Sequence, residues 1–258
     1  MNFLKKTSFF YLILLLGIWQ LSYKLGLYSD FFFPSPAEVI MFLWDGFFKN
    51  GDLWIAIGIS FKRLFLGFFI SLLIGVPLGM LCCTSNFLKA TLKKIALGLQ
   101  TLPSICWVPL TLLWFGQNNF AIIFVVCMGS IWSLIIGTEH SIQHIPSIYL
   151  KVAYTMGARR LMVLRTVVFP AALPLLVASI KQSWAFAWRS LLSAEIYIST
   201  IDGLGLGQLL HYGREMQAMG QVVSIILVLI FVGLFIEKFV FLPIENYITK
   251  RWGNSITL

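Results

Sequence analysis

Long apolar stretches alternate with short polar segments along this chain, and most of the charges fall in the polar segments. A helix needs about 20 mostly apolar residues to cross the hydrocarbon core of a bilayer. Six stretches approach or exceed this length, at about residues 8–27, 64–83, 95–115, 120–138, 168–198 and 222–242. The pattern predicts an all-α fold: a polytopic membrane protein with about six transmembrane helices in a single domain, residues 1–258.

Two of these stretches admit a second interpretation. The first follows Lys5 and Lys6, as a secretion signal would, but no small-x-small cleavage site follows Trp19, which favours a retained span. The third is interrupted by Pro103 and Pro109, which remove backbone hydrogen-bond donors. A simple kink and a broken helix that lines a transport pathway are both consistent with that interruption.

The segment at 31–60 is predicted to lie outside the spans, on the external side. Pro34 and Pro36 break it, and Ser35 is placed to cap a helix that begins at Pro36. Apolar and acidic residues then alternate at helical spacing, which predicts a helix lying in the membrane interface.

Composition narrows the class of protein. Of the 258 residues, 59% are hydrophobic and 11% are charged, whereas soluble domains average about 45–50% and about 25%. Too few charged side chains remain to cover a soluble globule, so a soluble enzyme, a disordered chain and a small disulfide scaffold are excluded. The four cysteines lie in apolar runs without a CxxC pair and are interpreted as small buried hydrophobic residues.

The net charge of +9 is distributed unevenly. With six spans, eleven Lys and Arg residues fall on the side that holds both termini, and five, including Lys62 and Arg63, fall on the other. Cytoplasmic loops carry an excess of basic residues, so both termini are predicted to be cytoplasmic. The excess of basic residues is thus interpreted as a determinant of membrane topology and not as a nucleic-acid interface.

Small residues recur every fourth position in the second stretch, at Gly67, Ser71, Gly75 and Gly79. They form one flat helix face, against which a second helix can pack closely in lipid. This stripe is predicted to be structural.

The polar segment at about 139–168 is predicted to be a cytoplasmic helical hairpin. Gly157 is placed to end one helix in a sharp turn, and Pro170 to close a second helix. Such a hairpin offers a compact handle for a soluble partner.

These residues resemble the signature of the permease subunits of ATP-binding-cassette (ABC) importers, which reads Glu-Ala-Ala, three variable residues, Gly, nine variable residues, Ile-x-Leu-Pro. The chain matches it at Ala153, Gly157 and Pro170, with conservative changes at Val167 and Phe169. Lys151 departs from it, because the family has glutamate there.

Further motifs, at 33–36, 109–116, 188–190 and 203–207, resemble the family branch that imports nitrate, taurine, aliphatic sulfonates and bicarbonate. Together they cover roughly residues 33–242. Related branches that carry vitamin or pyrimidine precursors share much of this pattern.

The resemblance implies a type I ABC importer permease in the bacterial cytoplasmic (inner) membrane. Its expected partners are a second permease copy, an external substrate-binding protein, and two ATPase subunits that bind ATP and Mg. The chain itself would be non-catalytic and would hold no cofactor, and it has no Gly-rich phosphate loop followed by Lys-Ser/Thr. Coupling to the ATPase is then expected to involve Ala153, Gly157, Ala158, Arg159, Arg160 and Pro170.

Charges inside the fifth stretch point to a substrate pathway. At 100° per residue, Gln182, Arg189 and Ser193 share one helical stripe, with Lys181 and Glu195 on a neighbouring one. Arginine can bind a planar oxyanion with two hydrogen bonds, so the stripe suits a small anionic substrate. Alternatively, Arg189 pairs with Glu195 or with backbone carbonyls and ties helices together.

Other functions are less well supported. His140 and His144, beside Glu139, lie one helical turn apart and could begin a zinc site, but a third ligand is not evident, so no metal is predicted. A membrane-embedded enzyme is less well supported because the sequence shows no recognisable pair of nucleophile and base. A secondary transporter driven by an ion gradient would have only Glu195 and Glu237 as acids within spans, and no repeated half is visible.

Overall fold

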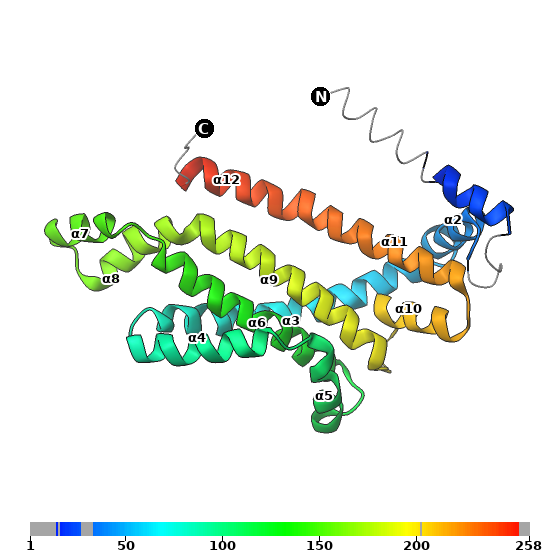
Figure 1. The fold of residues 1–258 in the computed structure, drawn as a ribbon, viewed down its shortest axis with the longest axis horizontal. Coiled ribbons are helices and arrows are strands. Elements are labelled where there is room, and N and C mark those ends of the chain that lie inside the picture. The colour runs from blue at the N-terminus through cyan, green and yellow to red at the C-terminus, as the bar shows by residue number, and fades with distance from the viewer. Residues whose placement is uncertain (1–13, 15, 27–32, 202, 253–258) are drawn as a thin grey trace. The chain divides into compact units, whose positions relative to one another are not determined.

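The computed structural model describes residues 14, 16–26, 33–201 and 203–252, which form helices joined by short turns (Figure 1). Residues 16–24 are helical, and residues 8–13, 15 and 27 of the first predicted span lie outside the described residues. The elements that follow are α2 Pro36–Trp44, η1 Asp45–Lys49, α3 Asp52–Cys82, α4 Asn86–Gln100, η2 Ser104–Trp107, α5 Val108–Phe115, α6 Asn119–Gln143, α7 Ser147–Thr155, α8 Arg160–Val163, η3 Leu164–Val168, α9 Phe169–Tyr197, α10 Leu206–Glu215, α11 Met219–Ile236, η4 Glu237–Phe241 and α12 Leu242–Trp252.

Four continuous helical stretches among the described residues are long and apolar enough to cross a membrane: Asp52–Cys82, Asn119–Gln143, Leu164–Tyr197 and Met219–Arg251. A fifth candidate is a broken pair, Phe87–Gln100 with Ser104–Phe115, bent by 97°. The all-α, multi-pass prediction is therefore confirmed for the described part of the chain.

Two predicted boundaries are wrong. The third stretch is broken at Pro103, as one of its two interpretations expected, and the error lies in its start, because α4 begins earlier, at Asn86. Residues 52–60 do not belong to a separate segment, because α3 starts at Asp52, directly after a left-handed Gly51 (φ 74°), and runs on to Cys82. The charges at 62 and 63 do not interrupt this helix.

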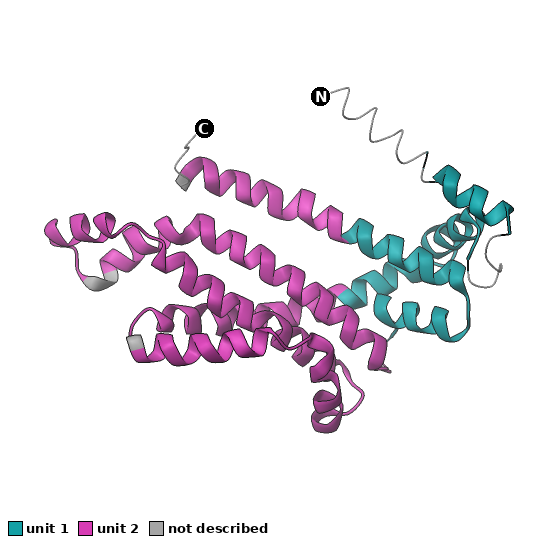
Figure 2. Cartoon of the chain, viewed as in Figure 1, with its two compact units in different colours: residues 1–60, 203–232 teal, residues 61–202, 233–258 magenta. Residues whose placement is uncertain are grey.

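The chain forms two compact units, coloured separately in Figure 2. Unit 1 comprises residues 1–60 and 203–232. Within it, the Ser35 side chain caps α2 by accepting a hydrogen bond from the Glu38 N–H, as predicted. Ser224 on α11 donates to the Val39 carbonyl at 3.1 Å and so attaches α2 to α11. The glycine-rich segment at 203–207 leads into α10, whose Leu206 N–H donates to Ser60 Oγ at 2.9 Å.

Unit 2 comprises residues 61–202 and 233–258, and α6 lies at its centre, packed along α9 (Figure 1). The predicted small-residue stripe of α3 lies against α6. A Cβ atom added at Gly75 would lie 2.8 Å from Leu134 Cβ, and one at Gly79 would lie 2.6 Å from Thr138 Cβ. Only glycine allows helix backbones to approach this closely, so the predicted structural role is confirmed.

A buried ion pair joins α3 to α9 in the same unit. Arg63 Nη1 lies 2.8 Å from Glu195 Oε1, and the two residues are 2% and 1% exposed. Arg63 also donates to Asn119 Oδ1 at 2.8 Å, at the start of α6, and to Thr200 Oγ1 at 2.6 Å, beyond the end of α9. One guanidinium thus connects three helices.

Arg63 was predicted to lie on the external side, before the second span, and the structure places it within α3; the side of the membrane on which it lies stays a prediction. A charge inside an apolar helix is tolerated when it faces a partner in the protein interior. Arg63 has that partner in Glu195, 132 residues away in sequence.

We expect Arg63→Met to destabilise the protein strongly, because it leaves the Glu195 carboxylate buried without its cation. Breaking a buried pair in this way costs about 3–5 kcal/mol, whereas replacing both partners with apolar residues is often neutral. The double variant Arg63→Met/Glu195→Met should therefore recover most of the loss. Thermal unfolding of the detergent-solubilised protein measures both effects.

Lys49→Met is the matched control. Lys49 pairs with Asp45, but their side chains are 66% and 46% exposed, so its loss should cost less than about 1 kcal/mol. Equal melting shifts for Arg63→Met and Lys49→Met would contradict a structural role for the buried pair.

Candidate functional site

A cavity of about 380 Å³ lies in unit 2, between the break after α4, helix α6 and helix α9. The break creates it: Pro103 has no N–H to continue a helix, and the chain turns through 97° between α4 and η2–α5. Gly129 brings α6 close to α9 beside the cavity, because a Cβ there would lie 1.8 Å from Ser190 Oγ. Polar groups line it at Gln100, Thr101, Ser104, Arg189, Ser190 and Ser193.

Among the described residues that line this cavity, Arg189 is the one that carries a charge. Its Nε donates to the Ala185 carbonyl at 3.1 Å, and its Cζ lies 4.7 Å from the centroid of the Phe186 ring. The guanidinium is exposed and forms no ion pair with any described carboxylate. Its remaining N–H groups are therefore available to a ligand.

Trp132, which sequence reasoning did not single out, also lines the cavity. Its indole Nε1 is buried and has no hydrogen-bond partner among the described residues. An indole nitrogen can only donate, and a buried donor left unpaired costs about 1–3 kcal/mol.

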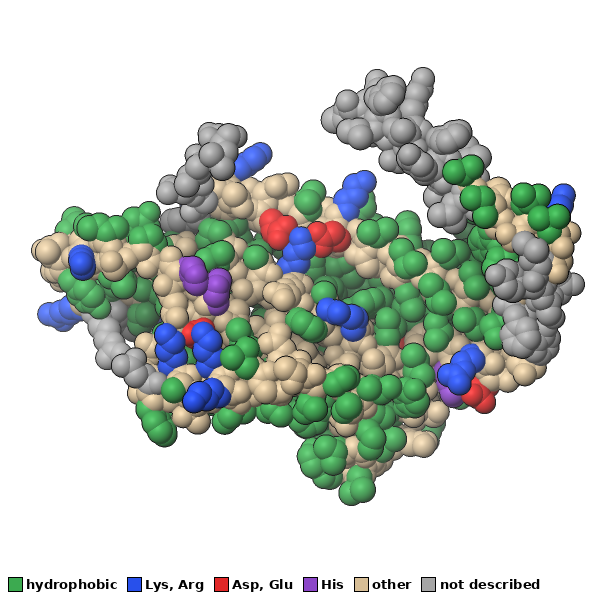
Figure 3. Space-filling model, viewed as in Figure 1, with side chains coloured by type: hydrophobic (Ala, Val, Ile, Leu, Met, Phe, Trp, Pro, Cys, Tyr) green, Lys and Arg blue, Asp and Glu red, His purple; other side chains and the backbone are tan. Residues whose placement is uncertain are grey.

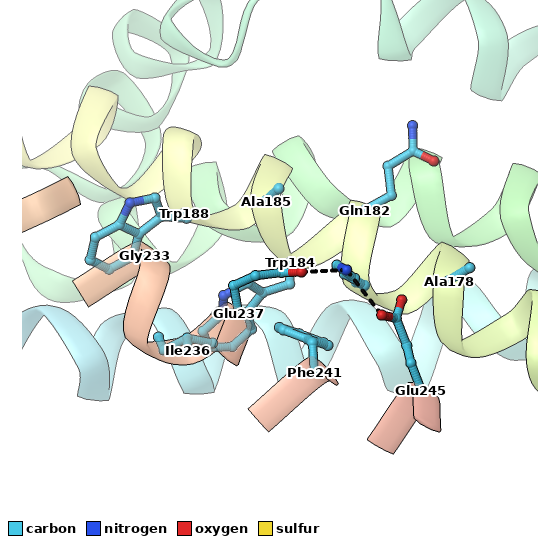
Figure 4. A pocket seen from close by; sticks show the side chains of 11 residues that line it. Ala178, Gln182, Trp184, Ala185, Trp188, Gly233, Ile236, Glu237, Phe241 and Glu245 are labelled. Carbon is cyan, nitrogen blue, oxygen red and sulfur yellow. Dashed lines mark hydrogen bonds and ion pairs between the residues drawn. The ribbon is translucent and has the colours of Figure 1, made fainter. Parts of the chain in front are cut away.

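The structure brings together two of the three predicted pathway residues. Arg189 and Ser193 both line this cavity, and Ser193 Oγ donates to the Arg189 carbonyl at 3.0 Å. Gln182 instead lines a second cavity in unit 2, of about 420 Å³. Figure 4 shows its side chain directed away from Glu237 and Glu245. The three residues that 100° spacing places on one side of the helix therefore line two different cavities.

The neighbouring charges are paired, but not as predicted. Glu195 pairs with Arg63, and Arg189 donates to the Ala185 carbonyl of its own helix, so of the two structural alternatives for Arg189 the described residues show a carbonyl contact and not the Glu195 pair. Lys181 lies 2.5 Å from Glu237 and 3.1 Å from Glu245, within the second cavity (Figure 4). Lys181 thereby holds α9 to the last helical segment of the chain.

The predicted hairpin is present and is hereafter called the docking hairpin, residues 147–168. Helix α7 ends in a turn at Gly157 (φ 78°), where the Ala158 N–H donates to the Ala153 carbonyl and the Gly157 N–H to the Tyr154 carbonyl, both at 3.0 Å. This hydrogen-bond pair is a Schellman motif, in which a residue with positive φ lets the chain reverse. Ala153 is buried and packs with Ile145, Val163, Val168 and Ala172.

Pro170 does not close the second helix of the hairpin. From Arg160 the chain stays helical through η3 into α9, which ends at Tyr197, and Pro170 lies in the first turn of α9. Its missing N–H is accommodated because η3 is a wider, π-helical turn, in which the Phe169 N–H donates to the Leu164 carbonyl.

A third cavity, of about 820 Å³, lies in the docking hairpin. Ala153, Gly157, Ala158 and Pro170 line it, so four of the predicted coupling residues share one groove. Arg159 is exposed outside the lining, and the side chain of Arg160 is outside the described part.

Glu139 was predicted to start a polar loop, but it belongs to α6 and is only 1% exposed. Its carboxylate lies 3.0 Å from Lys93 Nζ and 3.9 Å from Lys89 Nζ. Next to it, the rings of His140 and His144 stack with centroids 3.8 Å apart, as two residues on one helix face do. No group of three described His, Cys, Asp or Glu residues could hold a metal ion.

Comparisons with known proteins agree with this architecture. Residues 75–242 match the family "Binding-protein-dependent transport system inner membrane component". The chain is 30% identical to the bicarbonate transport system permease protein CmpB of Synechococcus elongatus, over 87% of this chain and 79% of the relative. It is 27% identical to the putative aliphatic sulfonates transport permease protein SsuC of Bacillus subtilis, over 93% and 85%.

The fold is also that of a solved transporter. The inward-facing MetNI methionine ABC transporter aligns with a TM-score of 0.65 at 20% identity, covering 78% of this chain and 97% of the other. Family match, sequence relatives and fold thus agree: the chain belongs to the binding-protein-dependent transport family and is an ABC importer permease.

Proposed function

We propose that this chain forms the membrane pathway of an ATP-driven importer for a small anion, such as bicarbonate, nitrate, taurine or another sulfonate. A second copy would complete the pathway, an external binding protein would deliver the substrate, and a separate ATPase would bind Mg and ATP and hydrolyse the nucleotide. Both termini would be cytoplasmic. Relatives of the chain are permeases named for bicarbonate and aliphatic sulfonates.

The observation that carries the anion assignment is the lining of the cavity beside α9. Its described lining residues include one cation, Arg189, and no carboxylate. The hydroxyl groups of Thr101, Ser190 and Ser193 donate to backbone carbonyls, so Arg189 is the donor that carries the assignment. A guanidinium can bind two oxygens of a planar or tetrahedral oxyanion at once, which a neutral substrate would not exploit.

Two alternatives are less well supported. A vitamin or pyrimidine precursor would suit the aromatic walls at Trp132 and Phe186, but it leaves the charge of Arg189 without a counterpart. An ion-gradient transporter needs a carboxylate that can take up and release protons within the membrane. Glu195 is bound to Arg63, and Glu237 shares Lys181 with Glu245, so both carboxylates are already engaged with a cation.

The docking hairpin is the proposed coupling element. Its groove and its glycine turn form a compact projection from α6 and α9, the two helices that line the anion cavity. Movement of the hairpin by a bound ATPase would therefore act directly on both helices. Ala153, Gly157, Ala158, Arg159, Arg160 and Pro170 are the residues proposed for this contact.

We expect Arg189→Gln to lower substrate uptake by about tenfold or more, because a charge-assisted hydrogen bond is worth about 1.5–3 kcal/mol. Copurification of the ATPase should be unchanged. Uptake into proteoliposomes that contain the reconstituted importer provides the measurement. The control is Arg214→Gln, which removes an exposed cation on α10 and should leave uptake intact. Unchanged uptake in Arg189→Gln would refute the anion site.

We expect Gly157→Glu to prevent copurification of the ATPase, because it strains the left-handed turn and places a large acidic side chain on the docking hairpin. The matched control is Gly51→Glu. Gly51 has φ 74°, also has open space where a Cβ would be added, and lies outside the hairpin. If both variants retain the ATPase, or both lose it, the hairpin is not the docking site.

A further inference from the structure

The docking hairpin carries charge of one sign. Residues 147–168 contain four basic residues and no acidic one. Lys151, Arg159 and Arg165 are exposed, and none forms an ion pair with a described carboxylate. Glu139, at the end of α6, is buried against Lys93 and Lys89 and is not available to them. On the face drawn in Figure 3, this end of the protein shows basic and apolar side chains.

The groove of the hairpin is apolar and open. Val152, Met156, Met162 and Val167 contribute to its lining, and none of the lining residues that the structure describes is charged. Met156 is 82% exposed and Met162 is 58% exposed. An unbranched methionine adapts its shape to an entering side chain, so this lining suits a protein partner.

The geometry favours a protein over a lipid surface. The apolar groups line a concavity of about 820 Å³ between α7 and residues 162–171, which a protruding side chain can fill. A flat bilayer surface would contact the rim and leave the groove empty. The basic residues lie outside the lining of the groove, where they can meet acidic groups that surround such a side chain.

Lys151 gives this surface a positive charge at a position where the family signature has a negative one. The signature has glutamate where this chain has an exposed lysine on α7. A partner surface with a basic residue opposite this position would repel Lys151, and like charges in an interface oppose binding.

We propose that the docking hairpin selects an ATPase whose contact surface presents an apolar side chain to the groove and carboxylates to Lys151, Arg159 and Arg165. This inference rests on the proposed coupling function and adds the chemistry of the partner. Lys151 then acts as a specificity residue that excludes ATPases built to receive glutamate.

The test measures the affinity of the solubilised permease for its separately purified ATPase, at about 0.05 M and about 0.5 M salt. Lys151→Glu should weaken binding at least tenfold at low salt, and the difference should shrink at high salt, where exposed charges are screened. Lys94→Glu is the control: Lys94 is an exposed cation on α4, outside the hairpin, and should have no effect. Thr166→Trp, which fills the groove from an exposed position, should also weaken binding.

A reciprocal change completes the test. Reversal of one ATPase carboxylate to lysine should restore binding to Lys151→Glu and weaken binding to the unchanged permease. The same affinities measured in nanodiscs of zwitterionic lipid and of anionic lipid should agree. If Lys151→Glu weakens binding only with anionic lipid, the hairpin binds the membrane surface and the proposal is overturned.

The outcomes separate this inference from the function on which it rests. If Gly157→Glu abolishes binding while Lys151→Glu and Lys94→Glu leave it equal to the unchanged protein, docking stands and charge selection is wrong. If Gly157→Glu also binds normally, the coupling role of the hairpin is wrong, and the inference falls with it.

Discussion

The ion pair between Arg63 and Glu195 is the constraint on which unit 2 depends. Two charges in an apolar interior are stable only when each satisfies the other and the remaining hydrogen bonds are made. Arg63 meets this requirement with Glu195, Asn119 and Thr200, and so fixes α3, the start of α6 and the end of α9 together. Helix α9 cannot rotate about its axis without separating the pair, and it is the helix that carries Arg189 and Ser193 into the cavity.

Close packing of small residues acts with this pair. Gly75 and Gly79 let α3 lie against α6, and Gly129 lets α6 lie against α9. The break at Pro103 then leaves space where a straight helix would have filled it. The resulting cavity presents the guanidinium of Arg189, which is the basis for the proposal that the pathway carries an anion.

Local features of the fold could be predicted from the sequence, and long-range ones could not. The cap at Ser35, the stripe on α3 and the turn at Gly157 depend on residues a few positions apart, so spacing was sufficient. The burial and pairing of Arg63 were missed because its partner lies 132 residues away, and Glu139 looked exposed because Lys93 comes from another helix. Angular spacing grouped Gln182 with Arg189, but the cavities are defined by α4, α6 and the last helical segment, which a single helix cannot reveal.

The most direct test of the anion cavity is the reactivity of a cysteine placed in it. Ser193→Cys, with the exposed Cys83 and Cys106 replaced by serine, would be treated with methanethiosulfonate reagents that carry either a sulfonate or a trimethylammonium group. A cleft of one charge sign raises the local concentration of opposite ions by about tenfold or more. We expect the sulfonate reagent to react about tenfold faster, and the transported anion to slow it. Equal rates, or a faster cationic reagent, would contradict the assignment of an anion pathway to α9.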